Sequence, residues 1–323
     1  MRLFTTGLVA VLSVLLFPAA TCADLFGSGA NSFTIDFVTI GAPNNPQDFF
    51  IGPPVGIAAP PGGGSVSYVF RMGTYEVSER MIAAANAEGN LGITQTSHGP
   101  DFPAGGISWL EAVRFVNWLN TSTGNPAAYK LDPAGNFQLW APTDPGYDPT
   151  NWFRNTQAKY FLPSHDEWYK AAYFDPLLGV YYDYPTGSDT APLRVAGGTA
   201  PGTAVYGGTF LPPHAPSPIM SAGGPSPFGT FAQGGNIGEL IETEIDKVND
   251  SVVGLRTVRG GAFVSDASNL SSYGTLSIQP TQEFVTVGFR VASRIPEPST
   301  LSLAIGFLWL ARGVARRIAR ATA

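Results

Sequence analysis

Glycine and proline recur along this chain more densely than long regular elements tolerate. The 323 residues include 38 glycines and 28 prolines, and only 13% of the residues are charged. Glycine loses the most backbone entropy on folding and proline removes a backbone donor, so both weaken helix and strand interiors. We therefore expect an irregular, loop-rich α+β fold with few helices and short strands, rather than a regular βαβ array.

The C-terminal segment 294–323 reads as a sorting signal and not as part of the folded body. Pro296, Glu297 and Pro298 precede an apolar run at residues 299–311, which predicts a short helix. The basic tip that follows contains Arg312, Arg316, Arg317 and Arg320. The run is shorter than the roughly 20 residues that span a bilayer core, and clustered arginines resist translocation. We expect this helix to hold the exported body transiently at the inner membrane, with its tip in the cytoplasm.

Two other interpretations of the tail are an ordinary single-span anchor and an amphipathic surface helix. The order of its parts resembles the PEP-CTERM sorting signal of Gram-negative bacteria. That resemblance implies an exosortase-type membrane enzyme as the processing partner, and a final location at the cell surface or outside the cell. The signal is associated with bacteria that produce exopolysaccharide, so the resemblance also implies a role in an extracellular matrix.

Residues 1–23 have the pattern of a secretory signal peptide. Arg2 supplies the positive charge, residues 8–17 the apolar region, and small residues precede a cleavage site after Ala23. The alternative is lipid attachment at Cys22, but Thr21 is unusual directly before a lipidated cysteine. Because Cys22 is the only cysteine, the mature body has none and must depend on its core, a metal, or both.

The composition of the body excludes a basic nucleic-acid-binding protein. The formal net charge is −6 and no basic stripe is present, so we expect no nucleic-acid partner. Residues 24–64 form a Pro/Gly/Asn-rich N-terminal segment with one predicted strand at residues 33–40. The roughly 270 residues between the two ends are enough for one large domain or two small ones, and we expect one domain at residues 65–293.

Two capping boxes specify the starts of helices. In Ser108–Glu111 and Ser164–Glu167, the serine and the glutamate satisfy each other's orphan backbone amides. Ser78 predicts the start of a further helix that runs to about residue 88. Alternating patterns predict strands at residues 66–77, 181–184, 257–263 and 287–292.

Six short motifs follow one another through the body. They are Gly73-Thr74-Tyr75-Glu76-Val77, Ile107-Ser108-Trp109, Leu162-Pro163-Ser164-His165-Asp166-Glu167-Trp168, Gly235-Asn236-Ile237-Gly238-Glu239-Leu240, Arg259-Gly260-Gly261-Ala262-Phe263 and Gly288-Phe289-Arg290-Val291-Ala292. In this order they resemble the formylglycine-generating enzyme (sulfatase-modifying factor) family, over about residues 66–292. The resemblance implies an irregular, C-type-lectin-like fold, which agrees with the loop-rich composition.

The chemistry of that family requires two cysteines that bind copper shortly after the Arg-Gly-Gly motif. The resemblance places these positions at Ser265 and Leu270, and neither residue can supply the thiolate that Cu(I) needs. The sequence therefore predicts no copper and no formylglycine-generating oxidase activity. Whether another catalytic activity remains stays open at this point.

The resemblance also implies a calcium site at Gly235, Ile237 and Glu239. One further ligand position falls at Ala232, whose side chain has no oxygen. Calcium takes six to eight oxygen ligands, so we expect a weak site at most. The alternative is a packing turn in which Glu239 bonds to backbone amides.

Other catalytic or metal-binding groups are sparse. The three histidines, His98, His165 and His214, lack the spacing of an iron site, and we expect His165 to be exposed in its first helical turn. Ser265 and Asp266 lack a nearby histidine and a nucleophile elbow, so a catalytic triad is not expected.

Four carboxylates, Glu239, Glu242, Glu244 and Asp246, follow one another closely. They could include the pair of a glycoside hydrolase, which needs two carboxyl groups facing each other across a cleft. A solvated acidic face is the favoured interpretation.

Together these observations predict a non-catalytic binding or extracellular-matrix module, with polysaccharide as the candidate ligand. Aromatic faces stack on sugar rings, and the candidate contacts are Trp140, Tyr147, Trp152 and Tyr182, each of which could instead be a packing residue. The alternatives are a hydrolase that uses carboxylates near Glu239 and a purely structural surface protein.

Overall fold

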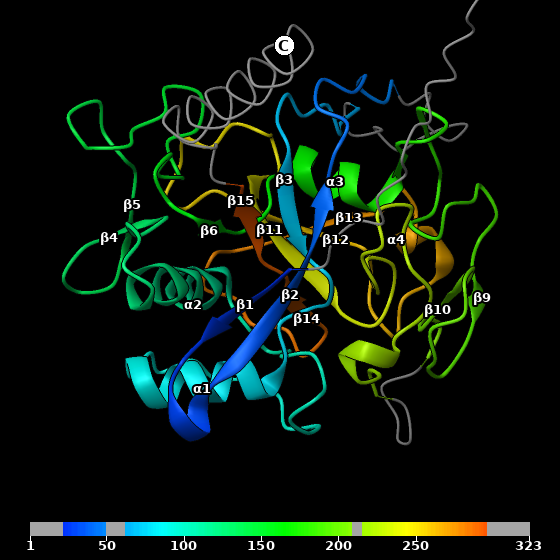
Figure 1. Cartoon of the computed structure of the whole chain (residues 1–323), viewed down its shortest axis with the longest axis horizontal. Coiled ribbons are helices and arrows are strands. Elements are labelled where there is room, and N and C mark those ends of the chain that lie inside the picture. Colours follow the sequence, from blue (N-terminus) through cyan, green and yellow to red (C-terminus); the bar gives the residue numbers. More distant parts are fainter. Residues whose placement is uncertain (1–21, 50–61, 209–214, 296–323) are drawn as a thin grey trace, which may run out of the picture.

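The computed structural model describes residues 22–49, 62–208 and 215–295. The predicted signal peptide lies outside the described residues except for Cys22 and Ala23, and so does the predicted sorting signal from Pro296 onward. In the part of the chain that is described, no helix has the length and apolar character needed to cross a membrane. Figure 1 shows the described elements in colour along the sequence.

A five-stranded antiparallel sheet joins the N-terminal and C-terminal ends of the described chain. Its strands in spatial order are β1 (Cys22–Phe26), β2 (Phe33–Ile40), β3 (Phe70–Gly73), β15 (Ala292–Arg294) and β6 (Tyr160–Phe161). The predicted strand at residues 33–40 is confirmed, because Phe33, Ile35 and Phe37 alternate as buried residues along β2. The N-terminal segment thus supplies two strands to the sheet that contains β3 and β15.

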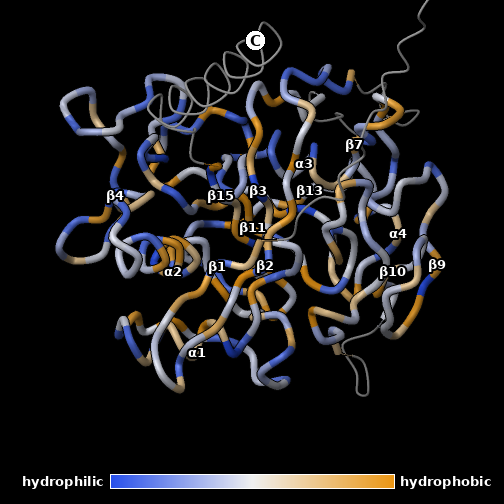
Figure 2. Tube along the Cα trace, viewed as in Figure 1, coloured by the Kyte–Doolittle hydropathy of each residue, from blue (hydrophilic) through white to orange (hydrophobic). Residues whose placement is uncertain are grey.

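A second sheet of four strands has the order β13-β12-β11-β14. Its strands are β11 (Gly238–Glu244), β12 (Arg256–Arg259), β13 (Thr275–Ile278) and β14 (Val287–Phe289). β11 pairs in parallel with β14 and antiparallel with β12, and every residue of β11 is buried. Figure 2 shows apolar residues gathered where β2, β3 and β11 cross the middle of the molecule.

Short two-stranded ribbons and helices surround the two sheets. The ribbons pair β4 (Lys130–Leu131) with β5 (Phe137–Gln138), β7 (Phe174–Asp175) with β8 (Val180–Tyr181), and β9 (Leu193–Arg194) with β10 (Thr203–Ala204). The helices are α1 (Glu79–Gly89), α2 (Trp109–Ser122), α3 (His165–Tyr173) and α4 (Ala267–Leu270), with 3₁₀ turns η1 (Gly29–Asn31) and η2 (Ile219–Ser221). α1 and α2 pack against each other beside the first sheet (Figure 1).

The predicted helix starts are confirmed at the level of single hydrogen bonds. Ser108 and Ser164 each accept a bond from the amide of the glutamate three residues on, and that glutamate bonds back to the serine amide. Ser78 caps α1 by accepting from the Met81 amide. These caps depend only on neighbouring residues, which is why the sequence predicts them well.

The strands are shorter than the sequence patterns predict. Residues 66–77 contribute only β3, and the predicted strand at 181–184 is reduced to β8. The strand expected at 257–263 ends at Arg259, because Gly260 and Gly261 adopt φ values of 85° and 68°. These left-handed conformations interrupt a β ladder. The architecture is nevertheless the expected α+β fold with few helices and short strands.

Candidate functional site

The buried strand β11 carries three glutamates, and each lies within ion-pair distance of a buried arginine from another part of the chain. The pairs are Glu239 with Arg290, Glu242 with Arg154, and Glu244 with Arg256. All six side chains are almost completely excluded from solvent. Buried charges require such partners, because an unpaired ion in a protein interior is very costly.

Both carboxylate oxygens of Glu239 are occupied. Oε2 accepts from Arg290 Nε at 2.6 Å and from Trp168 Nε1 at 2.7 Å, while Oε1 accepts from Arg290 Nη2. Arg290 also donates to the carbonyl oxygens of Gly73 and Phe231, at 3.0 and 2.8 Å. With a guanidinium against it, Glu239 is a poor ligand for a cation, so this arrangement does not fit the implied calcium site at Gly235, Ile237 and Glu239.

The second cluster joins two carboxylates through one guanidinium. Arg154 donates to Glu242 Oε2 at 2.7 Å and to both oxygens of Glu167 at 2.9 Å. Tyr129 and Tyr68 add hydroxyl donors to Glu242 and Glu167, at 2.9 and 2.6 Å. Burial alone would raise the pKa of Glu167, but the Arg154 guanidinium outweighs it and holds this pKa below its ordinary value. Arg154 therefore holds two ionised carboxylates together in the interior of the protein.

The expectation of a solvated acidic face is therefore wrong for Glu239, Glu242 and Glu244. Only Asp246, which lies beyond the end of β11, is exposed. Arginines that are distant in the sequence neutralise the three glutamates, and a local pattern cannot show this. The pairing also occupies the carboxylates that a hydrolase near Glu239 would need to have free in a cleft.

The two positions that correspond to copper-binding cysteines lie close together. A Cβ built on Gly261 would lie 3.1 Å from Leu270 Cδ1 and 3.2 Å from Ser265 Cβ, so both side chains converge there. Leu270 is fully buried, and Ser265 Oγ accepts from the Ala262 amide at 2.9 Å. A hydroxyl and an isobutyl group do not form a Cu(I) site. In the described ranges, no group of three or more His, Cys, Asp or Glu side chains is placed to hold a metal.

The expectation that His165 is exposed is wrong. Its side chain is only 7% exposed and stacks on Tyr169, with ring centroids 5.7 Å apart. Burial, reinforced by the nearby charges of Arg259 and Lys247, lowers the pKa of His165 well below its ordinary value. The segment at Gly63 covers the ring, because a Cβ there would come 2.6 Å from His165 Nε2.

The structure separates the four aromatic residues predicted to contact a ligand. Trp140 and Trp152 lie together, since the Trp140 amide donates to the Trp152 carbonyl at 2.9 Å, and Trp152 is 38% exposed. Tyr147 belongs to the same excursion between β5 and β6, whereas Tyr182 follows β8 elsewhere in the chain. None of them lines the cavities described below.

A cavity of about 740 Å³ opens next to the segment that contains Ser265. Gly207 and Gly208 hold its wall to that segment, donating to the carbonyls of Ser265 and Phe263 at 2.8 and 2.7 Å. Its lining includes three aromatic residues, one cation and one serine, namely Phe102, Tyr206, Phe263, Arg194 and Ser217. Local sequence patterns gave no sign of these residues, because strand β9 and three separate loops supply them.

Arg194 is the charged group of this cavity. It lies at the exposed end of β9. A Cβ built on Gly207 would come 3.2 Å from Arg194 Cδ, so the arginine side chain covers this glycine. Among the described residues, no carboxylate lies within ion-pair distance of its guanidinium. A cavity that combines aromatic walls with an available guanidinium suits a ligand with flat apolar faces and a negative charge.

Solved structures of several proteins share this architecture. Treponema denticola variable protein 1 is 18% identical, with a TM-score of 0.58 over 84% of this chain and 99% of that one. CarF is 21% identical, with a TM-score of 0.56 over 81% of this chain and 98% of that one. PvdO from Pseudomonas aeruginosa is 16% identical, with a TM-score of 0.50 over 84% of this chain and 98% of that one. At these identities the likeness concerns the fold alone.

No curated protein sequence matches this chain. A family model does, over residues 64–295, which include all six motifs, the three ion pairs of β11 and the cavity beside Ser265. The chain belongs to the family described as the sulfatase-modifying factor enzyme 1-like domain.

Proposed function

We propose that this protein is a non-catalytic binding module that recognises an acidic polysaccharide. The observation that carries the proposal is the cavity of about 740 Å³ beside Ser265 and Leu270. The scaffold there keeps an open, aromatic-lined cavity, while the residues at the two implied cysteine positions can supply no thiolate. Sugar rings stack on the faces of Phe102 and Tyr206, and a uronic-acid carboxylate pairs with Arg194.

The charge pairing of β11 supports binding rather than hydrolysis. A glycoside hydrolase needs one protonated and one ionised carboxyl group on opposite sides of the scissile bond. Glu239, Glu242 and Glu244 are instead buried in ion pairs with arginines, and none of them lines the cavity.

We further propose that the module acts outside the cell. The leader at residues 1–23 supports export, and the Pro-Glu-Pro motif with its apolar run and arginine tip supports processing by an exosortase-type enzyme. An extracellular, polysaccharide-rich matrix presents the acidic sugars that the Arg194 cavity suits. The proposed binding of polysaccharide outside the cell requires neither copper nor calcium.

The test is retention of the purified chain on immobilised polysaccharides, with a polyuronate and a neutral glucan as the matched pair. We expect retention on the polyuronate and a weaker response on the glucan. Arg194→Gln should weaken polyuronate binding about tenfold, because it removes the charge that pairs with the sugar carboxylate. Tyr206→Ala should weaken binding to both polymers, because it removes a stacking face.

The control variant is Arg80→Gln. Arg80 is an exposed arginine that is paired with Asp101 and does not line this cavity, and its loss changes the net charge by the same amount as the loss of Arg194. Binding should be unchanged in this variant. Equal losses in Arg194→Gln and Arg80→Gln would show nonspecific charge attraction, and no retention on any polysaccharide would refute the proposal.

A further inference from the structure

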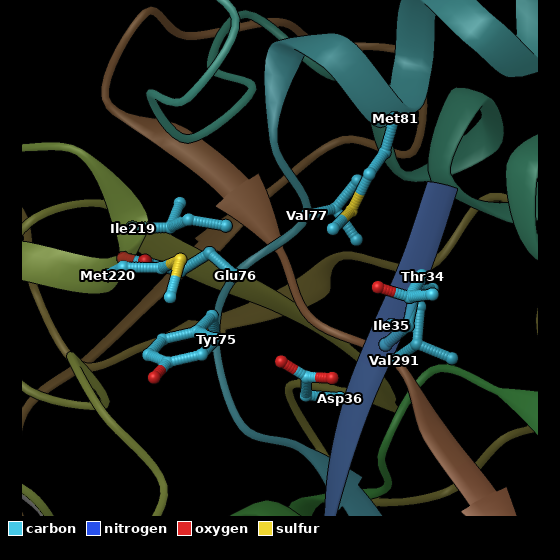
Figure 3. A pocket seen from close by; sticks show the side chains of 10 residues that line it. All are labelled: Thr34, Ile35, Asp36, Tyr75, Glu76, Val77, Met81, Ile219, Met220 and Val291. Atoms are coloured by element: carbon cyan, nitrogen blue, oxygen red, sulfur yellow. The ribbon is translucent and has the colours of Figure 1, made fainter. Parts of the chain in front are cut away.

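Two further cavities, which share no residue with the proposed polysaccharide site, have contrasting walls. The one shown in Figure 3 has a volume of about 120 Å³ and a mainly apolar wall that includes Ile35, Val77 and Ile219. The other lies at the start of α3, has a volume of about 270 Å³, and is lined by polar residues alone. That volume is many times the roughly 10–15 Å³ that one ordered water needs, so a small organic molecule can enter.

Three segments that are distant in the sequence form this polar cavity. They are the excursion between β5 and β6, the start of α3, and the end of β11 with the loop that follows it. The lining side chains carry hydroxyl, amide, imidazole, carboxyl or ammonium groups. One carboxylate and one ammonium group, those of Asp166 and Lys247, are among them, so the wall as a whole favours neither an anion nor a cation.

Hydrogen bonds hold the three segments together. Asn249 Nδ2 donates to Asn151 Oδ1 at 2.9 Å, and Asn151 Nδ2 donates to Glu242 at 2.6 Å. The His165 amide donates to Thr243 Oγ1 at 2.8 Å, which fixes the start of α3 to β11. Because Glu242 is one of the buried, ion-paired glutamates of β11, the cavity rests on the core of the protein. A preformed cavity of this kind loses little conformational entropy when it binds a ligand.

Asp166 supplies the cavity with a hydrogen-bond acceptor. Its Oδ1 accepts from the Gly64 amide at 2.9 Å, whereas Oδ2 accepts no hydrogen bond from the described residues. The residue is partly exposed, and Oδ2 is not one of the enclosed, unpartnered side-chain atoms of the described chain. This oxygen is therefore open to solvent and available to a ligand hydroxyl.

Ser164 and Asn249 supply donors, and both side chains are partly exposed. Ser164 Oγ accepts from the Glu167 amide at 3.3 Å, but its own hydrogen has no acceptor among the described residues. Asn249 Nδ2 carries two hydrogens, of which the bond to Asn151 uses one. The cavity thus offers donors and an acceptor side by side.

We propose that this cavity binds a neutral polyol, namely a sugar ring with adjacent hydroxyl groups. A hydroxyl group both donates and accepts, so it matches a wall that offers both kinds of partner. One sugar hydroxyl donates to Asp166 Oδ2, and its neighbour accepts from Asn249 Nδ2 or Ser164 Oγ. A simple anion would use the donors alone, and a simple cation the acceptor alone. The ligand is either a free sugar or a neutral sugar residue within a polymer, which share this chemistry.

The polyol site is separate from the Arg194 cavity, because the two have no lining residue in common. An uncharged sugar also gains no ion pair from Arg194. Retention on polyuronate and binding of a neutral polyol can therefore succeed or fail independently of each other.

The experiment is a ligand-observed NMR titration of the full chain with uncharged ligands. Glucose and mannose represent free sugars, cellotriose represents a neutral polymer, and cyclohexanol is the control, a ring of the same size with a single hydroxyl. We expect saturable binding of at least one sugar and at least about tenfold weaker binding of cyclohexanol. Binding of a monosaccharide points to a free sugar, and binding of cellotriose alone points to a polymer.

The variants test the role of the acceptor. In Asp166→Asn the Gly64 amide holds the remaining oxygen, so the group that is open to the ligand becomes an N–H donor. Sugar affinity should then fall at least about tenfold. Asp250→Asn removes the same charge from an exposed residue that does not line the cavity, and it should leave affinity unchanged.

Two results with the wild-type chain would overturn the proposal without requiring a folded variant. They are equal affinity for cyclohexanol and the sugars, and no binding of any sugar. An unaltered affinity in a folded Asp166→Asn variant would overturn it as well.

Discussion

The guanidinium of Arg290 and the carboxylate of Glu239 face each other in complete burial, with Nε 2.6 Å from Oε2. Glu239 lies on β11, and Arg290 directly follows the parallel neighbour β14. Trp168 donates to the same carboxylate from α3. This one contact therefore ties the second sheet to a helix, and through Gly73 to the end of β3 in the first sheet.

Removing one member of this pair should be strongly destabilising. Arg290→Met leaves Glu239 buried without its counter-ion, and we expect a loss of about 3–5 kcal/mol in the free energy of unfolding. Urea denaturation followed by tryptophan fluorescence measures it. The matched control is Arg80→Met, whose pair with Asp101 is exposed and should cost less than about 1 kcal/mol. Similar losses in both variants would contradict the structural role given to Glu239.

The stability of the protein should depend on pH through Glu76. Burial raises the pKa of this carboxyl from 4.5 to about 8, with Arg290 opposing the shift and Glu239 adding to it. The folded state thus holds a proton that the unfolded chain releases, so stability is complete below pH 4.5 and falls as the pH rises to about 8. Relative to Glu76→Gln, wild-type stability should fall by about 1.4 kcal/mol per pH unit within this window. Parallel pH profiles for the two chains would show that Glu76 has an ordinary pKa.

Calcium removal should leave the protein unchanged. Glu239 is already bonded to Arg290 and Trp168, and Ala232 offers no side-chain oxygen. Excess EGTA should therefore shift the melting temperature by no more than the scatter between repeats. A decrease of several degrees that added calcium restores would mean that a bound ion stabilises the fold.

Thiols placed at residues 265 and 270 should recreate a copper site. Both side chains approach the same point beside Gly261. A Cβ built on this glycine would lie 3.1 Å from Leu270 Cδ1 and 3.2 Å from Ser265 Cβ. The double variant Ser265→Cys/Leu270→Cys should bind one Cu(I) per chain in a competition assay with a chromogenic chelator, because two thiolates suit this ion. The wild-type chain and each single variant should fail to compete. Equal copper uptake by wild type would reveal a site elsewhere.

The sequence predicts local features of this fold more reliably than distant contacts. The three serine caps and the strand at residues 33–40 follow from neighbouring residues and are confirmed. The ends of the strands are predicted less accurately. Gly260 and Gly261 adopt left-handed φ values in the structure, and the alternating sequence pattern does not reveal this.

The buried charges could not be predicted from local patterns. Glu242 belongs to a short acidic stretch that resembles a solvated face, and only the fold reveals that Arg154 lies against it. His165 has the sequence position of an exposed first-turn residue, but the segment at Gly63 covers it. The cavity at Arg194 is assembled from separate loops, so no contiguous motif marks it.

The arginines that neutralise the glutamates of β11 come from segments before and after this strand, and this constrains the order in which the body can fold. Arg154 precedes this strand by many residues, whereas the partner of Glu239 is contributed by residue 290, close to the end of the body. A nascent or truncated polypeptide that stops short of that residue would have to leave a carboxylate unbalanced at its centre. Completion of the globule must therefore wait for the last segment, so synthesis from the N-terminus cannot give a fully compact body before residue 290 is available.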